Sequence, residues 1–355
     1  MQTRSRSGGL DAFRMIAALL VIAIHTSPLT SINDNADFFF TRILARVAVP
    51  FFFMVTGQFV VSEFLDKSGN AGNSLLASLR KIGLIYGVAI LLYIPIGIYA
   101  GHYKNLSFYD AIEMLVFDGT FYHLWYFPAC MVGLLLVYGL SRFLSLRSMT
   151  VIAAVLYVFG LLGDSYYGII EDTLLLGSIY DGAFEIFSYT RNGLFYAPIF
   201  LILGVWMKQW NEKAYNMKEK AYSRNAVSVG LAVSCTLMTV EGFVLHVNGL
   251  QRHDSMYIAL IPTMLFLYQL LLHWNLPRRR AFRTISTWIY VLHPAVIVGV
   301  RMIAKPLHLN AVLVENSVVH YLVVVVISVV AAGIVTTEVV TIGKKYRTYR
   351  THRTL

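Results

Sequence analysis

Residues 10–29 read LDAFRMIAALLVIAIHTSPL, an apolar run long enough to cross a lipid bilayer as one α-helix. The hydrocarbon core of a bilayer is about 30 Å thick and needs about 20 mostly apolar residues in helical form. Arg4 and Arg6 precede the run, as basic residues precede the apolar core of a signal peptide. However, the run contains Asp11 and Arg14 and no small-residue cleavage site. We therefore predict an uncleaved first membrane helix.

The rest of the chain repeats this pattern. Of its 355 residues, 57% are hydrophobic and 14% are charged, whereas roughly a quarter of a soluble domain is charged. This composition predicts an all-α, polytopic membrane bundle of about ten transmembrane helices, with the lipid bilayer as its main surroundings. The nine further spans are predicted at 42–62, 80–100, 121–141, 148–164, 190–208, 224–246, 255–273, 283–304 and 317–342.

The basic residues are unevenly shared between the two sides of these spans. Twenty-two of the 29 Lys and Arg residues lie at alternate connections and the chain ends, and seven lie at the others. The positive-inside rule places the basic-rich set in the cytoplasm, so we predict that both termini are cytoplasmic. Residues 1–343 would form the transmembrane domain, and 344–355 a basic cytoplasmic tail. A net charge of +10 spread over short connections sets topology, and we expect no nucleic-acid partner.

Two further features bear on the class of protein. Cys130 and Cys235 both lie inside apolar spans, so we expect neither a disulfide framework nor a metal site. The connection at 164–190 carries five acidic residues and could be an acidic lid or a solvated loop; we favour the loop. Its acidic residues are Asp164, Glu171, Asp172, Asp181 and Glu185.

Ionisable residues inside membrane helices are costly, so each one is a candidate for function. Arg14 and His25 are separated by eleven residues, which is about three helical turns, so both face one side about 16 Å apart. One interpretation is a helix that lines a passage, with a cation near the inner face and a base near the outer face. The alternative is an arginine that reaches the inner headgroups and a histidine that caps the helix before Pro28.

A second set of polar residues falls at the outer ends of several predicted helices. Taken singly, each suits an interfacial anchor, but together an acid, a base and a cation at one depth suit a polar substrate. Arg191-Asn192-Gly193 could also hold an anion at the positive end of a helix. His293 lies nearer mid-membrane, where a neutral histidine against a neighbouring helix is ordinary, and we include it as a candidate. The substrate-binding candidates are Arg46, His123, Arg191, His253, Asp254 and His293, with Glu241 as an acidic partner.

Three features of the sequence resemble the acyltransferase-3 family of membrane proteins. They are the spacing Arg14-x10-His25, the run VPFFF at 49–53, and STWIYVLH at 286–293. The resemblance implies about ten membrane helices and transfer of an acyl group from a cytoplasmic donor, such as acyl-CoA, to a hydroxyl on an extracytoplasmic acceptor such as a glycan. It implies functional roles for Arg14 and His25, with His25 as the base, and no tightly bound cofactor.

Four longer runs resemble the membrane half of VanT-type serine racemases from vancomycin-resistance clusters. They are RVAVPFFFM (46–54), YHLWYFPA (122–129), TRNGLF (190–195) and HDSMY (253–257). In that group a soluble, pyridoxal-phosphate-dependent racemase domain follows, and the membrane half is thought to take up or deliver L-serine. Because this sequence stops at Leu355, we expect no racemisation by this chain alone, unless the racemase is a separate polypeptide or was removed. The resemblance also implies a bacterial cell membrane, antibiotic resistance and cell-wall synthesis.

Three hypotheses remain open, and acyl transfer is the one the motifs favour. In it, His25 is the general base on an acceptor hydroxyl, Glu241 orients it, and Arg14 holds the anionic part of the donor. In the second, L-serine binds with its carboxylate on Arg191 and its ammonium on Glu241 or Asp254. In the third, the chain is an anchor that recruits a racemase through its basic tail.

Overall fold

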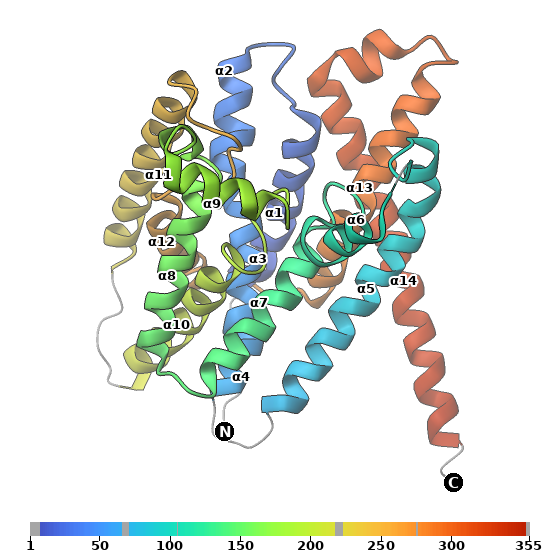
Figure 1. Ribbon diagram of the computed structural model, residues 1–355. Helices are drawn as coiled ribbons and strands as arrows, with labels where there is room; N and C mark the ends of the chain where they lie inside the picture. The colour runs from blue at the N-terminus through green and yellow to red at the C-terminus, as the bar shows by residue number, and fades with distance from the viewer. Residues whose placement is uncertain (1–7, 66–70, 105, 217–222, 275, 353–355) are drawn as a thin grey trace. The chain divides into compact units, whose positions relative to one another are not determined.

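The computed structural model describes the chain apart from residues 1–7, 66–70, 105, 217–222, 275 and 353–355 (Figure 1). Within the described residues every regular element is helical and no strand is present, so the all-α prediction is confirmed. The α-helices are α1 (Gly8–Thr26), α2 (Asp34–Asp37), α3 (Ala48–Thr56), α4 (Ser62–Leu65), α5 (Ala71–Tyr99), α6 (Phe108–Glu113), α7 (Tyr126–Ser141), α8 (Leu146–Leu162), α9 (Leu174–Phe184), α10 (Ala197–Asn216), α11 (Arg224–Val247), α12 (Leu260–Leu272), α13 (Arg280–Ala304) and α14 (Ser317–His352).

Each of the ten predicted spans contains a helix, but they differ in length. Among the described residues, six helical segments are long and apolar enough to cross a membrane. The other four predicted spans hold α7, α8, α10 and α12. Of these, α7, α8 and α12 are shorter, and α10 is longer but more polar. The six long segments are Gly8–Thr26, Asp34–Leu65, Ala71–Tyr99, Arg224–Val247, Arg280–Ala304 and Ser317–Val339.

The second of these segments is continuous but irregular. A π-helix, η1 (Phe38–Ile43), and a 3₁₀ turn, η2 (Leu44–Val47), precede α3, and a second π-helix, η3 (Gly57–Val61), follows it. Pro50 lies in the first turn of α3, where its missing N–H removes a hydrogen bond to the preceding turn. The irregular backbone therefore lies on either side of the short α-helix that contains this proline.

The chain divides into two compact units, and the first comprises residues 1–41 and 271–355. Within it α1 packs on α13 and α14. Its apolar core includes Ala18 and Ile22 of α1, Ile289 and Ile297 of α13, and Val324 of α14. α14 continues beyond the predicted domain boundary at 343, and the predicted basic tail, whose side chains lie outside the described residues, stays a prediction.

The second unit comprises residues 42–270, and its centre is α10 packed on α3, α7 and α8. Two glycines allow the closest approach. A Cβ on Gly57 would lie 1.9 Å from the Leu201 carbonyl oxygen, and one on Gly204 would lie 2.0 Å from the Met54 carbonyl oxygen. Small residues let helix backbones touch in this way where lipid supplies no hydrophobic drive between helices.

The connection at 164–190 is more ordered than the favoured loop interpretation. It contains the eleven-residue helix α9, with the sequence LLLGSIYDGAF. The acidic residues suggested solvation, but of the five only Asp181 lies within this helix, and the eleven residues of the helix are mostly apolar and make three helical turns. The prediction of a simple solvated loop was therefore wrong.

Candidate functional site

In the first unit, the candidate residues lie inside long helices. The Arg14 Nε lies 3.7 Å from an Asp11 carboxylate oxygen one turn earlier on α1. The Arg14 and Asp11 side chains are only 11% and 4% exposed. This burial argues against an arginine that simply extends into the headgroups, and it gives the guanidinium a counter-charge on its own helix.

The same unit brings together two predicted histidines from different helices. His25 of α1 stacks on His293 of α13, with ring centroids 5.3 Å apart and planes inclined by 25°. His293 is fully buried, and its Nδ1 lies 2.9 Å from the Tyr290 carbonyl oxygen and 3.2 Å from that of Ile289. Because a carbonyl oxygen can only accept, Nδ1 carries the proton and Nε2 carries the lone pair.

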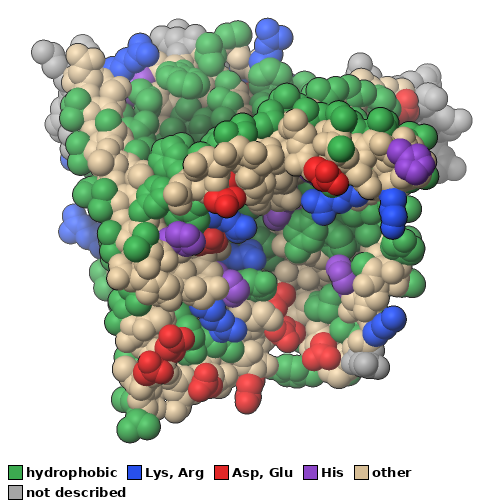
Figure 2. All heavy atoms as spheres, turned by 90° about the horizontal axis from the view of Figure 1, so that it is seen from above, with side chains coloured by type: hydrophobic (Ala, Val, Ile, Leu, Met, Phe, Trp, Pro, Cys, Tyr) green, Lys and Arg blue, Asp and Glu red, His purple; other side chains and the backbone are tan. Residues whose placement is uncertain are grey.

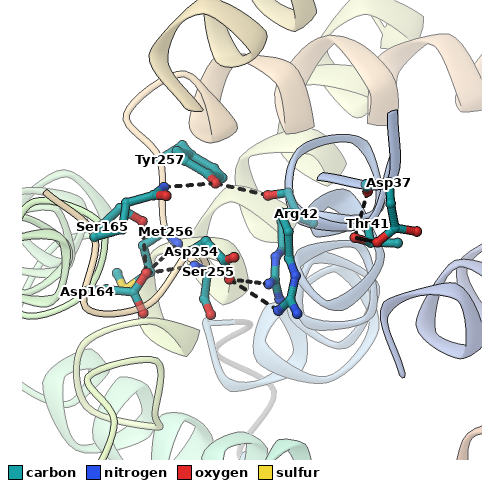
Figure 3. A network of polar contacts seen from close by, with 11 residues as sticks. Asp37, Thr41, Arg42, Asp164, Ser165, Asp254, Ser255, Met256 and Tyr257 are labelled. Carbon is teal, nitrogen blue, oxygen red and sulfur yellow. Dashed lines mark hydrogen bonds and ion pairs between the residues drawn. The ribbon is translucent and has the colours of Figure 1, made fainter. Parts of the chain in front are cut away.

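In the second unit, the candidates lie at helix ends and in loops. The carboxylate of Asp254 accepts a 2.5 Å hydrogen bond from Arg46 and lies 3.5 Å from Arg42 (Figure 3). Burial alone would raise the pKa of Asp254, but the charges of Arg46 and Arg42 outweigh it and hold this pKa below its usual value. The structure thus brings together two predicted residues, Arg46 and Asp254, and adds Arg42.

Asp164 organises the loop that carries His253 and Asp254. It follows the end of α8 and is fully buried, and its Oδ1 accepts hydrogen bonds from the backbone N–H groups of Ser255 (2.7 Å) and Met256 (2.9 Å) (Figure 3). Burial raises its pKa to about 6. In the sequence Asp164 is only one of the acids of the 164–190 connection, because an aspartate just past a helix end is an ordinary turn residue.

Arg191 rests on two aromatic rings. Its guanidinium carbon lies 4.7 Å from the Trp125 ring centroid and 4.2 Å from that of Tyr189. Burial and the charge of Arg46 lower its pKa. Within the described part of the chain, Arg191 forms no ion pair with a carboxylate. Sequence reasoning missed Trp125 and Tyr189, since each also suits an interfacial aromatic belt.

The ring of His253 packs against Tyr189, one of the two rings that contact Arg191. Its ring centroid is 4.5 Å from that of Tyr189. Burial, followed by the charges of Arg191 and Arg252, lowers its pKa to about 4. His253 is therefore neutral at physiological pH. We call Arg46, Arg191, Asp164, Asp254, Trp125 and Tyr189, together with His253, the arginine–aromatic group.

The predicted anion site at Arg191-Asn192-Gly193 is wrong in its mechanism. α10 begins only at Ala197, and the Asn192 side-chain oxygen accepts hydrogen bonds from the N–H groups of Leu194 (2.9 Å) and Phe195 (3.2 Å). These donors are thus already engaged. An anion here would bind to the Arg191 guanidinium and not to a helix N-terminus.

Glu241 accepts hydrogen bonds from neighbours in the second unit. Its Oε1 accepts hydrogen bonds from the Tyr166 hydroxyl (2.7 Å) and the Ile258 N–H (2.6 Å), and its Oε2 accepts one from the Ala259 N–H (2.8 Å). These bonds hold the turn that leads into α12. Its predicted role as the partner of His25 stays a prediction that none of these contacts supports.

His123 is buried in an aromatic setting just before α7. Its ring centroid lies 4.9 Å from that of Tyr93 on α5, and it also contacts the rings of Phe121 and Tyr122. Its ring contacts are thus aromatic, and a substrate role for His123 stays a prediction.

The described residues hold no group of three or more His, Cys, Asp or Glu side chains arranged for a metal ion. Cys130 and Cys235 are free thiols. Figure 2 shows one face of the molecule, on which acidic, basic and histidine side chains are visible together with hydrophobic ones.

Comparison with known proteins agrees with the motifs. The sequence model of the acyltransferase-3 family, described as an acyltransferase domain, matches residues 7–337. An amino-acid racemase of Enterococcus faecalis is 44% identical over 331 residues, which cover 92% of this chain and 45% of the relative. A second E. faecalis amino-acid racemase is 38% identical over 333 residues, covering 93% and 46%. A serine/alanine racemase of Enterococcus gallinarum is 33% identical over 328 residues, covering 91% and 45%.

This chain thus spans about half the length of the curated relatives that it matches. No solved structure matches it. The match over residues 7–337 and the helices long enough to cross a bilayer lead to one conclusion. The chain belongs to the acyltransferase-3 family of integral membrane proteins.

Proposed function

We propose that this chain is a multi-pass protein of the bacterial cell membrane that binds an amino acid, L-serine first among them, and delivers it to a racemase. The observation that carries the proposal is Arg191, a half-buried cation on two aromatic faces with no carboxylate partner in the described chain. A guanidinium held in this way suits the planar carboxylate of a substrate.

The acidic residues of the second unit decide where the ammonium of the amino acid would bind. Three donors engage Glu241, and two arginines engage Asp254. Asp164 keeps its buried Oδ2 without a hydrogen-bond partner among the described residues. We therefore assign the ammonium to Asp164 in preference to the other two, so that the group provides one site of each charge for a zwitterion.

The relatives support the same substrate class. They are named as racemases of amino acids, and one as a serine/alanine racemase, while this chain matches under half of each. The proposal includes ten spans with both termini cytoplasmic, which sets the arginine–aromatic group at the outer face. The racemase would be pyridoxal-phosphate-dependent and would supply D-serine for cell-wall synthesis in vancomycin resistance, as the resemblance to VanT-type proteins implies.

Binding and uptake of labelled L-serine by purified protein in vesicles test this proposal. Arg191→Gln is expected to abolish both, because it removes the carboxylate partner. The matched control is Arg142→Gln, at an exposed arginine of the same unit, which is expected to behave as the unaltered protein. Well-folded protein that neither binds nor transports L-serine would contradict the proposal.

A second function, acyl transfer, is favoured by the stacked His25 and His293. The carbonyl contacts of His293 hold its ring in place, and that ring in turn orients His25. His25 would take the proton of an acceptor hydroxyl as its oxygen attacks the acyl carbon of an acyl-CoA; the carbon–sulfur bond breaks, and the proton passes to the departing thiolate. Arg14 would bind an anionic part of the donor. No tightly bound cofactor is needed.

The two functions are separable because their residues belong to different units. His25→Ala is expected to abolish acyl transfer from labelled acetyl-CoA to a glycan acceptor and to leave L-serine binding within twofold. Arg191→Gln is expected to do the reverse. If His25→Ala protein keeps full acyl transfer, His25 is not the base; if neither variant changes either assay, the anchoring hypothesis gains.

A further inference from the structure

Helix α9 has one face attached to the second unit and one face that is not covered. Tyr180 is fully buried, its ring stacks on Phe159 of α8 with centroids 4.6 Å apart, and its hydroxyl donates to the Phe159 carbonyl oxygen. Gly177 lies against the backbone of Glu171, where a Cβ would come within 2.6 Å of the carbonyl oxygen. The opposite face carries Leu174, which is 96% exposed, and Leu175, which is 73% exposed.

A second short segment presents a similar face. It comprises α6 and the π-helix η4 (Met114–Asp118) that continues it, and its Phe108 is 84% exposed. The Tyr109 hydroxyl donates a 2.8 Å hydrogen bond to the carbonyl oxygen of Glu185, which follows α9 directly. The Ser188 hydroxyl donates to Glu113 at 3.0 Å. These bonds join the two segments into one surface.

We name this surface the apolar ledge. Its members are exposed hydrophobic side chains of α6, η4, α9 and the residues after α9. They are Phe108, Tyr109, Ile112, Leu115, Val116, Leu174, Leu175, Ile179 and Ile186. A group of exposed apolar side chains of this extent marks an interaction surface.

The position of the ledge along the chain identifies what covers it. α5, one of the helices long enough to span a membrane, exposes Leu91, Ile98 and Tyr99 as it approaches α6. α8 exposes Val151, Val155 and Val158 as it approaches α9, at the spacing of one helix face. The ledge thus follows closely on the exposed apolar face of a helix long enough to span a membrane, and exposed polar residues such as Lys104 and Asp172 lie at the connections, as suits the boundary between lipid and water.

The geometry of α9 agrees with a place at the membrane boundary. Its eleven residues span only about 16 Å, which is too short to cross the hydrocarbon core. In Figure 1, α9 runs across the direction of α8 instead of along it. Exposed carboxylates lie at the two ends of this apolar face, Asp172 before α9 and Asp181 in its last turn, as suits a short helix that lies in the plane of the interface.

We propose that α9 and the α6 segment lie flat in the water–lipid boundary, with the apolar ledge inserted among the acyl chains of one leaflet. The partner is the bilayer itself and not a protein. This placement does not depend on the reaction of the chain. It does bear on the arginine–aromatic group. The guanidinium carbon of Arg252, the residue before His253, lies 3.2 Å from the ring centroid of Phe184 in α9.

Site-specific fluorescence tests this placement in the full chain. The background is Cys235→Ala, and the remaining Cys130 is fully buried and should not label. Leu174→Cys, Leu175→Cys and Phe108→Cys carry an environment-sensitive fluorophore in vesicles of phosphatidylcholine and phosphatidylglycerol. Doxyl-labelled lipids quench from the hydrocarbon, and iodide quenches from water. Val155→Cys on α8 is the lipid-facing control, and Asp172→Cys is the water-facing control.

The expected result is several-fold stronger quenching by doxyl lipid than by iodide at the three ledge positions, as at Val155, with the reverse at Asp172. Quenching by iodide alone at the ledge would show that it faces water and would overturn the proposal. Quenching by neither would show that protein covers the ledge and would overturn it as well. Because the substituted side chains are exposed, the labelled variants should stay monodisperse, which size-exclusion chromatography checks.

Discussion

The two units of the chain assemble their polar residues in different ways. In the first unit, Asp11, Arg14 and His25 lie within one long helix, and His293 is added from a second. In the second unit, Asp164 and Asp254 lie at helix ends and loops that are 90 positions apart in sequence. A helix sets the relative placement of its own side chains, whereas a group built from loops depends on every helix that positions those loops.

The two groups also differ in charge. The first holds one arginine against one aspartate and, about three helical turns further along α1, two stacked imidazoles. With Arg42, the second holds three arginines against the carboxylates of Asp164 and Asp254, and aromatic rings support Arg191. The first thus suits proton transfer, and the second suits an anionic or zwitterionic ligand. The predictions that follow test this distinction.

The largest loss of stability is expected where two helices of the second unit pack with their backbones in contact. Gly57→Ala places a Cβ 1.9 Å from the Leu201 carbonyl oxygen, so α10 must move away. We expect a loss of about 3 kcal/mol or more and loss of L-serine binding, measured by thermal unfolding in detergent. Gly87→Ala on α5, where nothing lies within 4 Å, is the control and should change little. Equal melting temperatures for both variants would contradict the packing argument.

A similar effect is expected from breaking the ion pair of the first unit. Arg14→Leu leaves the buried Asp11 carboxylate without its counter-charge, which costs about 3–5 kcal/mol. The double variant Asp11→Asn/Arg14→Leu removes both charges and should recover most of that loss. Thermal unfolding of the two variants provides the comparison. Should the double variant be as unstable as the single one, the pair would not account for the effect.

A smaller, pH-dependent effect is expected in the second unit. Folding raises the pKa of Asp164 from 3.8 to about 6, so the folded state holds this proton more tightly and stability falls as pH rises from about 4 to about 6. A shift of about two units corresponds to about 3 kcal/mol at most. His253, whose pKa falls from 6.5 to about 4, acts oppositely, and stability rises over pH 4–6.5.

Single substitutions should therefore separate these opposing slopes. Asp164→Asn removes the contribution that lowers stability as the pH rises. The melting temperature should therefore rise more steeply between pH 4 and 6.5 than in the unaltered protein. His253→Gln removes the contribution that raises stability as the pH rises. The melting temperature should therefore fall over the same pH range. Asp181→Asn, at an exposed carboxylate, is the control. Parallel curves for all variants would rule out both assignments.

The smallest effect is expected from the aromatic platform. Tyr189→Leu removes one of the two rings under Arg191 and the ring beside His253. A cation–π contact contributes about 1 kcal/mol, so L-serine should bind roughly fivefold more weakly, with little change in melting temperature. Tyr99→Leu, at an exposed tyrosine of α5, is the control. Unchanged affinity would mean that Trp125 alone supports the guanidinium.

The sequence predicted the helices better than the neighbours of their polar residues. Hydropathy located a helix in each of the ten predicted spans, and the spacing of Arg14 and His25 singled out α1. Glu241 accepts hydrogen bonds from the turn before α12, which the sequence did not indicate, and its role as the partner of His25 stays a prediction. The signal for Asp164, Trp125 and Tyr189 was too weak, because each residue type has an ordinary role at a helix end or a membrane interface.

By itself, the sequence determined that this chain is helical, suited to lipid and a member of its family, because apolar runs and short motifs are local properties of the chain. Only the tertiary structure decided that His25 stacks on His293 and that Asp164 holds the loop of Asp254. Those contacts join positions 268 and 91 residues apart. They depend on where each helix ends and how closely its neighbours pack, and no local pattern contains that information.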